Sequence, residues 1–426
     1  MKKSFVKIFA LILSVVMLTA LLAACSPSGS GGSSGGSSGG SSGGSAPTSY
    51  DGPPMTVRVA AICPVTGTGA RRAIIEEAAI AAAEQHMAED NYLNPAYQIE
   101  FIRPFIDDEN STDRAPVAAN LAISMNVNAV INHHQTPMVL ISAPLFEEAG
   151  IPNFSMVSGP AVCEQGWKYQ HIGTVTDTDA AVTLADYLID VKGIKSVLVA
   201  CLNDEGGIAG ANAVMDRLIE KGIDIPKENY MLFEASDTNF SAYALKAKEL
   251  GVDCVLAYQI TRQNGLIFYD QVEQLYAQIP EEVIFVGSTA FAQPSMAQLW
   301  PHDKLEGIAF PSGFIQNPDD PFKVRFSTQF EANDPEHMLP GDNDGRVYDA
   351  CWNIAAAINL LAENDGYIDP TDPTFNERLN YWIRQIDREG VQGHINYKAY
   401  DDGRMLAEAN IGEWDDNGVP WKVFPK

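Results

Sequence analysis

Short hydrophobic strands and hydrophobic helices alternate along the chain from residue 55 onward. A strand is expected at 55–63, an Ala-rich helix at 73–87 and a second strand at 97–105. The alternation continues with helices at 114–125 and 137–150 and with strands at 128–131 and 151–156. Parallel strands need a long crossover connection, which is usually a helix. The pattern therefore predicts an α/β fold with parallel sheets.

The same alternation restarts at 185–191, which indicates a second α/β lobe. In the helix expected at 241–251, Ala244, Ala247 and Leu250 fall on one face, and Gly251 is placed to end the helix. The other expected elements are strands at 195–201, 230–235, 252–258 and 281–287 and helices at 210–222 and 266–278. The chain is thus expected to form two Rossmann-like lobes.

The acidic balance of the composition excludes one class of partner. Among the 426 residues, Asp and Glu number 55 against 28 Lys and Arg, which gives a formal net charge of −27 at pH 7. Binding to phosphate groups needs a basic face. No nucleic-acid partner is therefore expected.

The first 24 residues have the layout of a secretory signal, in which lysines precede an unbroken apolar stretch that ends in small residues. The segment LLAAC ends at Cys25 and resembles the lipobox of bacterial lipoproteins, in which this cysteine carries the lipid. A transmembrane anchor is the alternative, since the stretch is nearly long enough to span a bilayer. The Gly/Ser-rich residues 25–50 are expected to form a tether of roughly 25 to 30 Å. The folded part is therefore expected outside the cytoplasm, anchored to the cell membrane.

A polar cluster, VINHHQTPMV at 130–139, stands where a strand should turn into a helix. In an open parallel sheet, ligands bind beyond the carboxyl ends of the strands, where polar loops do not disturb the core. Thr136 is expected as the N-cap of the next helix, with Pro137 at the first helical position. The start of that helix is also a ready carboxylate site.

Seven segments after the first expected strand form a recognisable series. They are CPVTGTGA, IDDENSTDRAPVAANLAISMNVNAVI, APLFEEAGIPNFSMVSGP, SDTNFSAYALKAKELGVDCVLAYQ, LEGIAFPSGF, RVYDACWNIAAAINLLAE and GVQGHINYKAYDDGRM. Taken in order, they resemble the type I periplasmic solute-binding proteins of ABC transporters, in particular the branched-chain amino-acid-binding group. No single segment is specific, but their order and spacing cover nearly the whole chain after residue 55.

The resemblance implies two lobes joined by three crossovers around a cleft that closes on its ligand. The crossovers are expected near Thr176, Pro311 and Asn396. This gives an N-terminal lobe of 55–175 plus 312–395 and a C-terminal lobe of 176–311 plus 396–426.

The resemblance also implies which residues of the first lobe contact the ligand. A loop hydroxyl at the place of Thr136 and the segment at Ser158 and Gly159 are expected to hold a ligand carboxylate, with Gln135 beside them. A hydroxyl and helix-end amides can bind an anion without a full countercharge. Ser158 and Gly159 could equally form only a turn.

The second lobe departs from the pattern of the amino-acid binders. Thr289 stands where they place the acidic partner of the ligand ammonium, and Gly206 stands where they place an aromatic residue. Asp204 or Glu205 could replace the missing acid, or could simply be solvated. Asn203, Tyr258 and Thr289 complete the ligand contacts expected in this lobe.

Two arginines open the helix expected at 73–87, where cations oppose the helix dipole. Arg71 and Arg72 could form surface ion pairs with Glu76 or Glu77 one turn on. Alternatively, Arg72 reaches the cleft and meets an anionic group of the ligand. In that case the ligand could be an organic acid rather than a standard amino acid.

Neither a metal site nor a disulfide framework is indicated. His133 and His134 are adjacent on an extended segment and point in opposite directions, so one imidazole, that of His134, is expected to face the cleft. No HExxH or CxxC spacing accompanies them. Besides Cys25 the chain has five cysteines, of which Cys63 and Cys163 could pair.

The leading hypothesis is a lipid-anchored, extracytoplasmic binding protein that takes up a small amino acid or related carboxylate and delivers it to an ABC permease. No cofactor is expected, and no P-loop motif or catalytic motif in its structural context indicates an enzyme. A ligand-sensing subunit that signals through a membrane partner and an extracytoplasmic hydrolase on a related scaffold are the alternatives.

Overall fold

The computed structural model describes residues 50–67, 69–234, 236–260, 262–277, 283–294, 296–407 and 409–425. The expected signal segment 1–24, the expected lipidation site Cys25 and nearly all of the tether lie outside these residues. Within the described ranges, none of the helices combines the length and the apolar character needed to cross a membrane.

The first sheet is entirely parallel in its strand pairs. Its strand order is β2-β1-β4-β5-β6, with β3 paired to the end of β1. The strands are β1 (Met55–Cys63), β2 (Tyr97–Phe101), β3 (Ile106–Asp107), β4 (Ala129–Asn132), β5 (Asn153–Ser155) and β6 (Gln170–Ile172).

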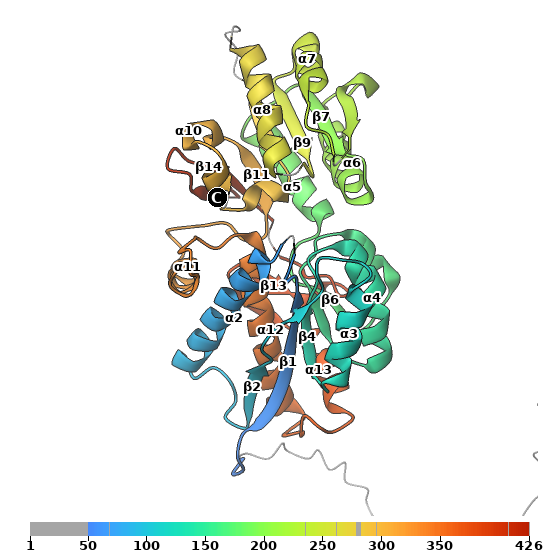
Figure 1. Cartoon of the computed structure of the whole chain (residues 1–426), viewed down its shortest axis with the longest axis vertical. Coiled ribbons are helices and arrows are strands. Elements are labelled where there is room, and N and C mark those ends of the chain that lie inside the picture. Colours follow the sequence, from blue (N-terminus) through green and yellow to red (C-terminus); the bar gives the residue numbers. More distant parts are fainter. Residues whose placement is uncertain are drawn as a thin grey trace, which may run out of the picture. The chain divides into compact units, whose positions relative to one another are not determined.

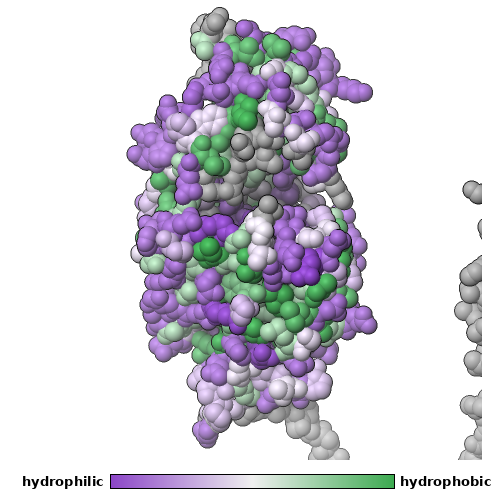
Figure 2. Space-filling view, in the orientation of Figure 1, coloured by the Kyte–Doolittle hydropathy of each residue, from purple (hydrophilic) through white to green (hydrophobic). Residues whose placement is uncertain are grey.

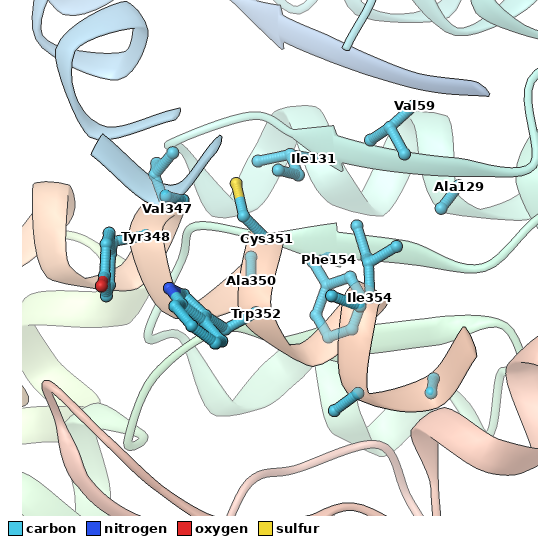
Figure 3. Close-up of a cluster of buried hydrophobic side chains, with 14 of the residues drawn as sticks. Val59, Ala129, Ile131, Phe154, Val347, Tyr348, Ala350, Cys351, Trp352 and Ile354 are labelled. Carbon is cyan, nitrogen blue, oxygen red and sulfur yellow. The ribbon is translucent and has the colours of Figure 1, made fainter. Parts of the chain in front are cut away.

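Helices cover both faces of the first sheet (Figure 1). They are α2 (Arg71–Glu89), α3 (Ala115–Ser124), α4 (Thr136–Ala149), α11 (Pro321–Asn333), α12 (Asp342–Asn364) and α13 (Phe375–Ile383). Side chains alternate along β1: Val57 and Val59 join the core shared with α2 and α12, whereas Ala60 and Ile62 join the core shared with α3. Figure 3 shows side chains of α12 beside Ile131 and Phe154 of this sheet.

The second sheet has the order β15-β14-β11-β10-β9-β7-β8. It is parallel from β8 to β11, and β14 and β15 extend it with antiparallel pairs. The strands are β7 (Val197–Leu202), β8 (Tyr230–Phe233), β9 (Cys254–Tyr258), β10 (Ile284–Gly287), β11 (Ala309–Ser312), β14 (Asn410–Trp414) and β15 (Pro420–Phe424).

Helices pack against both faces of the second sheet, with one hydrophobic core on each face. The helices are α5 (Asp177–Asp190), α6 (Glu205–Glu220), α7 (Ser241–Leu250), α8 (Arg262–Tyr276), α9 (Met296–Leu299) and α10 (His302–Leu305). A separate hairpin consists of β12 (Asp387–Gly390) and β13 (Gly393–Asn396). Short 3-10 turns are η1 (Pro160–Gln165), η2 (Lys227–Asn229), η3 (Thr289–Ala292) and η4 (Tyr397–Ala399).

The predicted α/β fold with parallel sheets is confirmed, with differences at particular elements. The strand expected at 97–105 is divided into β2 and β3, and Pro104 between them lacks the N–H that a ladder needs. The strands β6, β14 and β15 were not separately predicted. β14 and β15 make the edge of the second sheet antiparallel, which the βαβ pattern does not indicate.

The chain passes between the two sheets at the segments that join β6 to α5, β11 to α11 and β13 to β14. Tyr397 and Met405 still pack in the core of the first sheet, whereas Ala409 packs with Val175 and Ala180 at the start of the second lobe. The lobe limits near Thr176, Pro311 and Asn396 stay a prediction.

The five described cysteines are all buried and unpaired. They are Cys63, Cys163, Cys201, Cys254 and Cys351. The pairing of Cys63 with Cys163 that the sequence left open is therefore absent, and the thiols pack as small hydrophobic groups.

Hydrophilic residues predominate on the molecular face shown in Figure 2, with apolar patches between them. Large exposed apolar side chains include Val117 and Leu121 of α3 and Leu245 of α7. Scattered apolar side chains are normal on soluble domains. They do not indicate an interface by themselves.

Candidate functional site

A cavity of about 1390 Å³ is lined by segments that follow strands of both sheets. On the side of the first sheet it is lined by Arg72, His134, Gln135, Thr136, Pro137, Leu140, Met156, Val157, Ser158, Gly159, Pro160, Ala161, Glu164, Asp342, Asn343 and Arg346. On the side of the second sheet it is lined by Asp177, Asp204, Gly206, Ala209, Gln259, Ile260, Leu266, Ile267, Thr289, Ala290, Gln293, Leu299 and Trp300. Most of these residues lie beyond the carboxyl ends of parallel strands, where such sheets bind ligands.

The start of α4 forms one wall of the cavity. Its N-cap is Gln135, in extended conformation, and Thr136 is the first helical residue. The expectation that Thr136 is the N-cap is therefore wrong by one residue, which leaves its hydroxyl free of a capping role. A Cβ at Gly159 would overlap Thr136 Oγ1, so the glycine lets the two segments approach closely. Gln135 donates from Nε2 to Asn110 Oδ1 at 2.8 Å.

The two arginines at the start of α2 have different surroundings. Arg71 forms a bidentate ion pair with Asp334, at 2.9 and 2.7 Å. Glu77 instead pairs with Arg103 at 2.8 Å. The expected local pairing of the arginines with the glutamates one turn on is therefore wrong for Arg71, and Arg72 lines the cavity.

Among the described residues, no carboxylate lies at ion-pairing distance from the guanidinium of Arg72. Its Nη1 donates to His134 Nδ1 at 3.3 Å, and His134 Nε2 contacts the carboxyl group of Glu76. Burial lowers the pKa of His134 well below its usual value. Burial also raises the pKa of Glu76 to about 8. Near neutral pH both partners are therefore uncharged, and the guanidinium retains its charge toward the cavity.

His133 lies away from the cavity. Its Nδ1 is 2.8 Å from Asp108 Oδ2, and both side chains are fully buried. The expectation that only His134 faces the cleft agrees with this placement. No group of three His, Cys, Asp or Glu side chains suited to a metal ion occurs in the described part of the chain.

Arg346 also lines the cavity; both of its Nη atoms are bound by the protein, whereas its buried Nε has no hydrogen-bond partner. Nη2 pairs with the Asp342 carboxylate, and Nη1 donates to the carbonyl of Met156 at 2.9 Å. Asp342 Oδ1 in turn accepts from Ser312 Oγ at 2.8 Å and from the Gly313 N–H at 2.9 Å. This pair joins the start of α12 to the end of β11 and is expected to be structural.

Asp177, the first residue of α5, is an acidic group of the cavity that the sequence analysis missed. It is 5% exposed, and its Oδ1 has no hydrogen-bond partner. Its backbone N–H donates to the carbonyl of Ser158 at 2.8 Å. Burial raises the pKa of Asp177, and a hydrogen bond from the Ser158 side chain opposes this shift. Ser158 thus connects the two lobes' walls rather than forming only a turn.

Of the other residues expected to contact the ligand in the second lobe, some line the cavity and others do not. Asp204 and Thr289 line the cavity, but Asp204 is also the N-cap of α6 and accepts from the Gly207 N–H at 2.7 Å. The side chain of Glu205 lies outside what the structure describes. Asn203 donates to Glu234 at 2.7 Å, and Tyr258 is fully buried. Neither of these two lines the cavity.

Apolar side chains form much of the wall on the second-lobe side. They are Ile260, Leu266, Ile267, Leu299 and Trp300, together with Leu140 of α4. No sequence signal distinguishes these residues, because they lie in helices and loops where an apolar residue is normally a core residue. A cavity with an apolar wall on one side and charged side chains on the other suits a ligand that carries both an apolar and a charged group.

Raising the pH from 6.5 to 8.5 is expected to lower the free energy of unfolding. Burial raises the pKa of Glu76 to about 8 and that of Asp344 to about 7, so the folded state holds protons that the unfolded state has lost. Stability from such groups is present below the unfolded pKa and disappears as the pH passes the folded pKa, by about 1 kcal/mol per pH unit and group. The lowered pKa values of His134 and His171 affect the free energy of unfolding below pH 6.5, where they make it rise with increasing pH. Denaturant unfolding at several pH values measures the slope.

Glu76→Gln tests the origin of that slope. The variant cannot ionise, so the decline between pH 6.5 and 8.5 should become shallower. The matched variant Glu249→Gln changes a largely exposed side chain of α7 and should leave the slope as in the wild type. An unchanged slope in Glu76→Gln would contradict the assignment.

Comparison with known proteins places this geometry in a family. The sequence model of the family described as periplasmic binding protein matches residues 56–419. No curated protein matches the chain in sequence.

Solved structures of solute-binding proteins share the fold. The leucine-binding protein LivK from Thermotoga maritima is 20% identical, with a TM-score of 0.67 over 86% of this chain and 97% of that one. The branched-chain amino acid binding protein LivJ from Streptococcus pneumoniae, solved with isoleucine, is 20% identical, with a TM-score of 0.70 over 87% and 100%. A solute-binding protein from Rhodopseudomonas palustris, solved with 3,4-dihydroxybenzoic acid, is 17% identical, with a TM-score of 0.70 over 86% and 96%. At these identities the likeness establishes the fold.

Proposed function

Because the chain belongs to the periplasmic binding protein family, we propose that it captures a small carboxylate-bearing solute in the cavity and delivers it to an ABC permease. The uncompensated guanidinium of Arg72 carries this proposal. Its side chain faces the cavity, and its neighbours His134 and Glu76 are held uncharged by burial. A solute carboxylate would supply the missing countercharge through strong charge-assisted hydrogen bonds.

The start of α4 supports the same ligand chemistry. Backbone N–H groups at a helix start and the helix dipole favour an anion, and the Thr136 hydroxyl lies at this position without a capping role. The expected contacts at Gln135, Ser158, Gly159 and His134 border the same wall. The solutes in the two related complexes, isoleucine and 3,4-dihydroxybenzoic acid, both bear a carboxyl group.

Capture would involve closure of the two lobes about the three crossing segments, as in other binding proteins with hinges between lobes. The cavity is lined from both lobes, so a bound solute can hold them together. We propose that the solute is returned chemically unchanged, which makes the protein a carrier and not an enzyme.

The proposed location is outside the cytoplasm, which the family assignment implies. We propose further that the segment 1–24 is removed and that Cys25 carries the lipid, on the strength of the LLAAC motif. The Gly/Ser-rich tether would then keep the folded domain near the membrane while it meets its permease.

Arg72→Gln is expected to weaken binding of a carboxylate solute by about 100-fold, because it removes one partner of a desolvated charge pair. The probes are L-leucine, L-phenylalanine, benzoate and 4-methylpentanoate, followed by thermal shift and then by calorimetry for those that bind. A solute at about 100 times its Kd should stabilise the wild type by about 2.7 kcal/mol.

Arg71→Gln is the matched control, since it removes the neighbouring arginine, whose partner is Asp334. It should bind the probes as the wild type does. Equal affinity in Arg72→Gln and the wild type, or equal losses in both variants, would contradict the proposal. Stabilisation by neutral sugars or amides alone would contradict the ligand class.

A further inference from the structure

We propose that ionised Glu76 competes with the solute carboxylate for Arg72, so that capture of the solute is coupled to the uptake of one proton by the protein. This inference rests on the proposed function and adds control by pH to the same site. Glu76 lies in α2 four residues after Arg72, so the two side chains share one face of the helix. Glu76 is 1% exposed and does not line the cavity, so it acts on a solute only through Arg72.

His134 connects these two side chains. The Arg72 guanidinium can only donate hydrogen bonds, so the contact of 3.3 Å from its Nη1 makes His134 Nδ1 the acceptor. The single ring proton of the neutral imidazole is therefore on Nε2, which faces Glu76 Oε1. A second ring proton, on Nδ1, would point at the guanidinium. The geometry thus holds His134 neutral, and Glu76 is the member of this chain whose charge can change.

The protonation state of Glu76 sets the charge that a solute meets at Arg72. Glu76 Oε1 accepts from His134 whether or not the carboxyl group is protonated, so both states fit the same contacts. With Glu76 protonated, the two residues together carry one positive charge, and a solute carboxylate supplies the countercharge. With Glu76 ionised, the two charges cancel and the buried carboxylate repels a second one. Such an interaction is strong, because buried charges are only weakly screened.

The coupling between solute and proton is reciprocal. Burial raises the pKa of Glu76 to about 8, and the positive charge of Arg72 opposes that shift. A carboxylate bound to Arg72 cancels the opposing charge, so the pKa of Glu76 rises further in the complex. The complex therefore takes up a proton from the solvent, which forms the O–H bond of the Glu76 carboxyl group. Affinity is accordingly highest below the pKa of Glu76 in the free protein and falls as the pH rises through it.

Titratable groups from several other elements act on Glu76 besides His134. They are Cys63 of β1, Asp108 after β3, His133 after β4, and Asp344 and Cys351 of α12. The Cys63 thiol donates a hydrogen bond to the Glu76 carboxyl group, and burial raises the pKa of both thiols, so they stay uncharged. Asp108 and His133 contact each other at 2.8 Å and are fully buried. Asp344 is therefore the rival candidate for a titration near pH 8.

Asp344 differs from Glu76 in its contacts. Burial raises the pKa of Asp344 to about 7, and Arg72 opposes this shift as well. Its Oδ2, however, accepts from the Gly341 N–H at 2.7 Å at the start of α12. Among the described residues, no hydrogen bond joins Asp344 to Arg72 or His134. Asp344→Asn is therefore expected to leave the pH dependence of binding near pH 8 in place.

The test measures affinity and proton uptake by calorimetry. The probes are L-leucine, L-phenylalanine, benzoate and 4-methylpentanoate. Relative to Glu76→Gln, the wild type should lose about tenfold in affinity for a carboxylate between pH 7 and pH 9. Comparison at equal pH cancels the titration of an amino acid's own amine. In buffers that differ in their enthalpy of ionisation, the wild type should take up about half a proton per bound solute at pH 8, and close to one at pH 9.

Glu76→Gln keeps an acceptor for His134 Nε2–H but cannot ionise, so its complex should form without proton uptake from this residue. Glu77→Gln is the matched control, because it makes the same substitution at the next residue of α2, whose exposed side chain pairs with Arg103 at 2.8 Å. It should keep both the wild-type decline in affinity and the wild-type proton uptake. The melting temperature of each variant at each pH verifies that the protein is folded.

Each remaining outcome overturns a definite part. If a carboxylate binds but its affinity follows the pH equally in the wild type and in Glu76→Gln, Glu76 does not compete for Arg72, while the proposed function stands. Binding to the wild type at pH 8 without proton uptake overturns the inference as well, and this measurement needs no variant. If none of the carboxylate probes binds at pH 7, both this inference and the proposed function fail.

Discussion

Gly403→Ala is expected to lower the free energy of unfolding by about 3 kcal/mol or more. Gly403 has a φ of +81°, and a Cβ there would overlap the carbonyl oxygen of Gln170. The Gly403 carbonyl also accepts from the Ile172 N–H at 3.0 Å, so the segment before the third crossing is bound to β6. The clashing atom is backbone, and no rotation of a side chain can relieve it. Denaturant unfolding measures the loss.

Comparison with Gly166→Ala separates two contributions to the loss of stability in Gly403→Ala: the steric overlap with Gln170 and the left-handed backbone conformation. Gly166 has a φ of +73°, but a Cβ there would meet no atom within 4 Å. Its free energy of unfolding should therefore fall only by the cost of placing an alanine in the left-handed conformation, about 1 kcal/mol. Similar losses in the two variants would show that the contact with Gln170 does not contribute.

Asp342→Ala is expected to lower the free energy of unfolding by about 3 to 5 kcal/mol. The change leaves the Arg346 guanidinium buried without its carboxylate and removes the acceptor for Ser312 Oγ and the Gly313 N–H. These groups link the end of β11 to the start of α12, which are separated in sequence by α11. Denaturant unfolding measures the loss, and Glu249→Ala, in a partly exposed intrahelical pair with Lys246, should lose less than about 1 kcal/mol.

A double variant distinguishes a lost ion pair from lost packing. Asp342→Leu combined with Arg346→Met replaces the pair with apolar side chains and should recover part of the stability, because no charge is then left buried. If the double variant is less stable than Asp342→Ala alone, the network at the end of β11 matters more than the uncompensated charge.

The fold could be predicted from the sequence because its signals are local. The strand expected at 55–63 has the observed bounds of β1, and Gly150 and Gly251 end α4 and α7 in left-handed conformation, as expected. Such elements depend on periodicity and on single breaking residues. The antiparallel strands β14 and β15 depend on their neighbours in the sheet, which no local pattern indicates.

The site could be predicted in part, for a similar reason. Thr136, Ser158 and Arg72 were expected at the cleft from the resemblance to solute-binding proteins, and His134 from its place after a strand; all four line the cavity, and their contact with a ligand stays a prediction. Tyr258 continues the alternation of β9 that places Cys254 and Leu256 in the core, so its burial could have been inferred from the period of two.

The missed residues depend on contacts that are distant in sequence. Arg71 pairs with Asp334, 263 positions away, so the spacing to nearby glutamates was misleading. Asp177 resembles any acidic residue in the first turn of a helix until its burial against Ser158 is known. Arg346 belongs to α12, which is buried over most of its surface, and its partners became apparent only with the packing.

The order in which the elements occur along the chain constrains when each lobe can fold. One face of the first sheet is covered by α12 and α13, and the edge of the second sheet is formed by β14 and β15. A chain that emerges from its N-terminus onward would leave one face of the first sheet incompletely covered until α12 and α13 follow, and would leave β11 unpaired on one side until β14 follows. Completion of the first core and of the second sheet would thus be delayed until nearly the whole polypeptide has emerged.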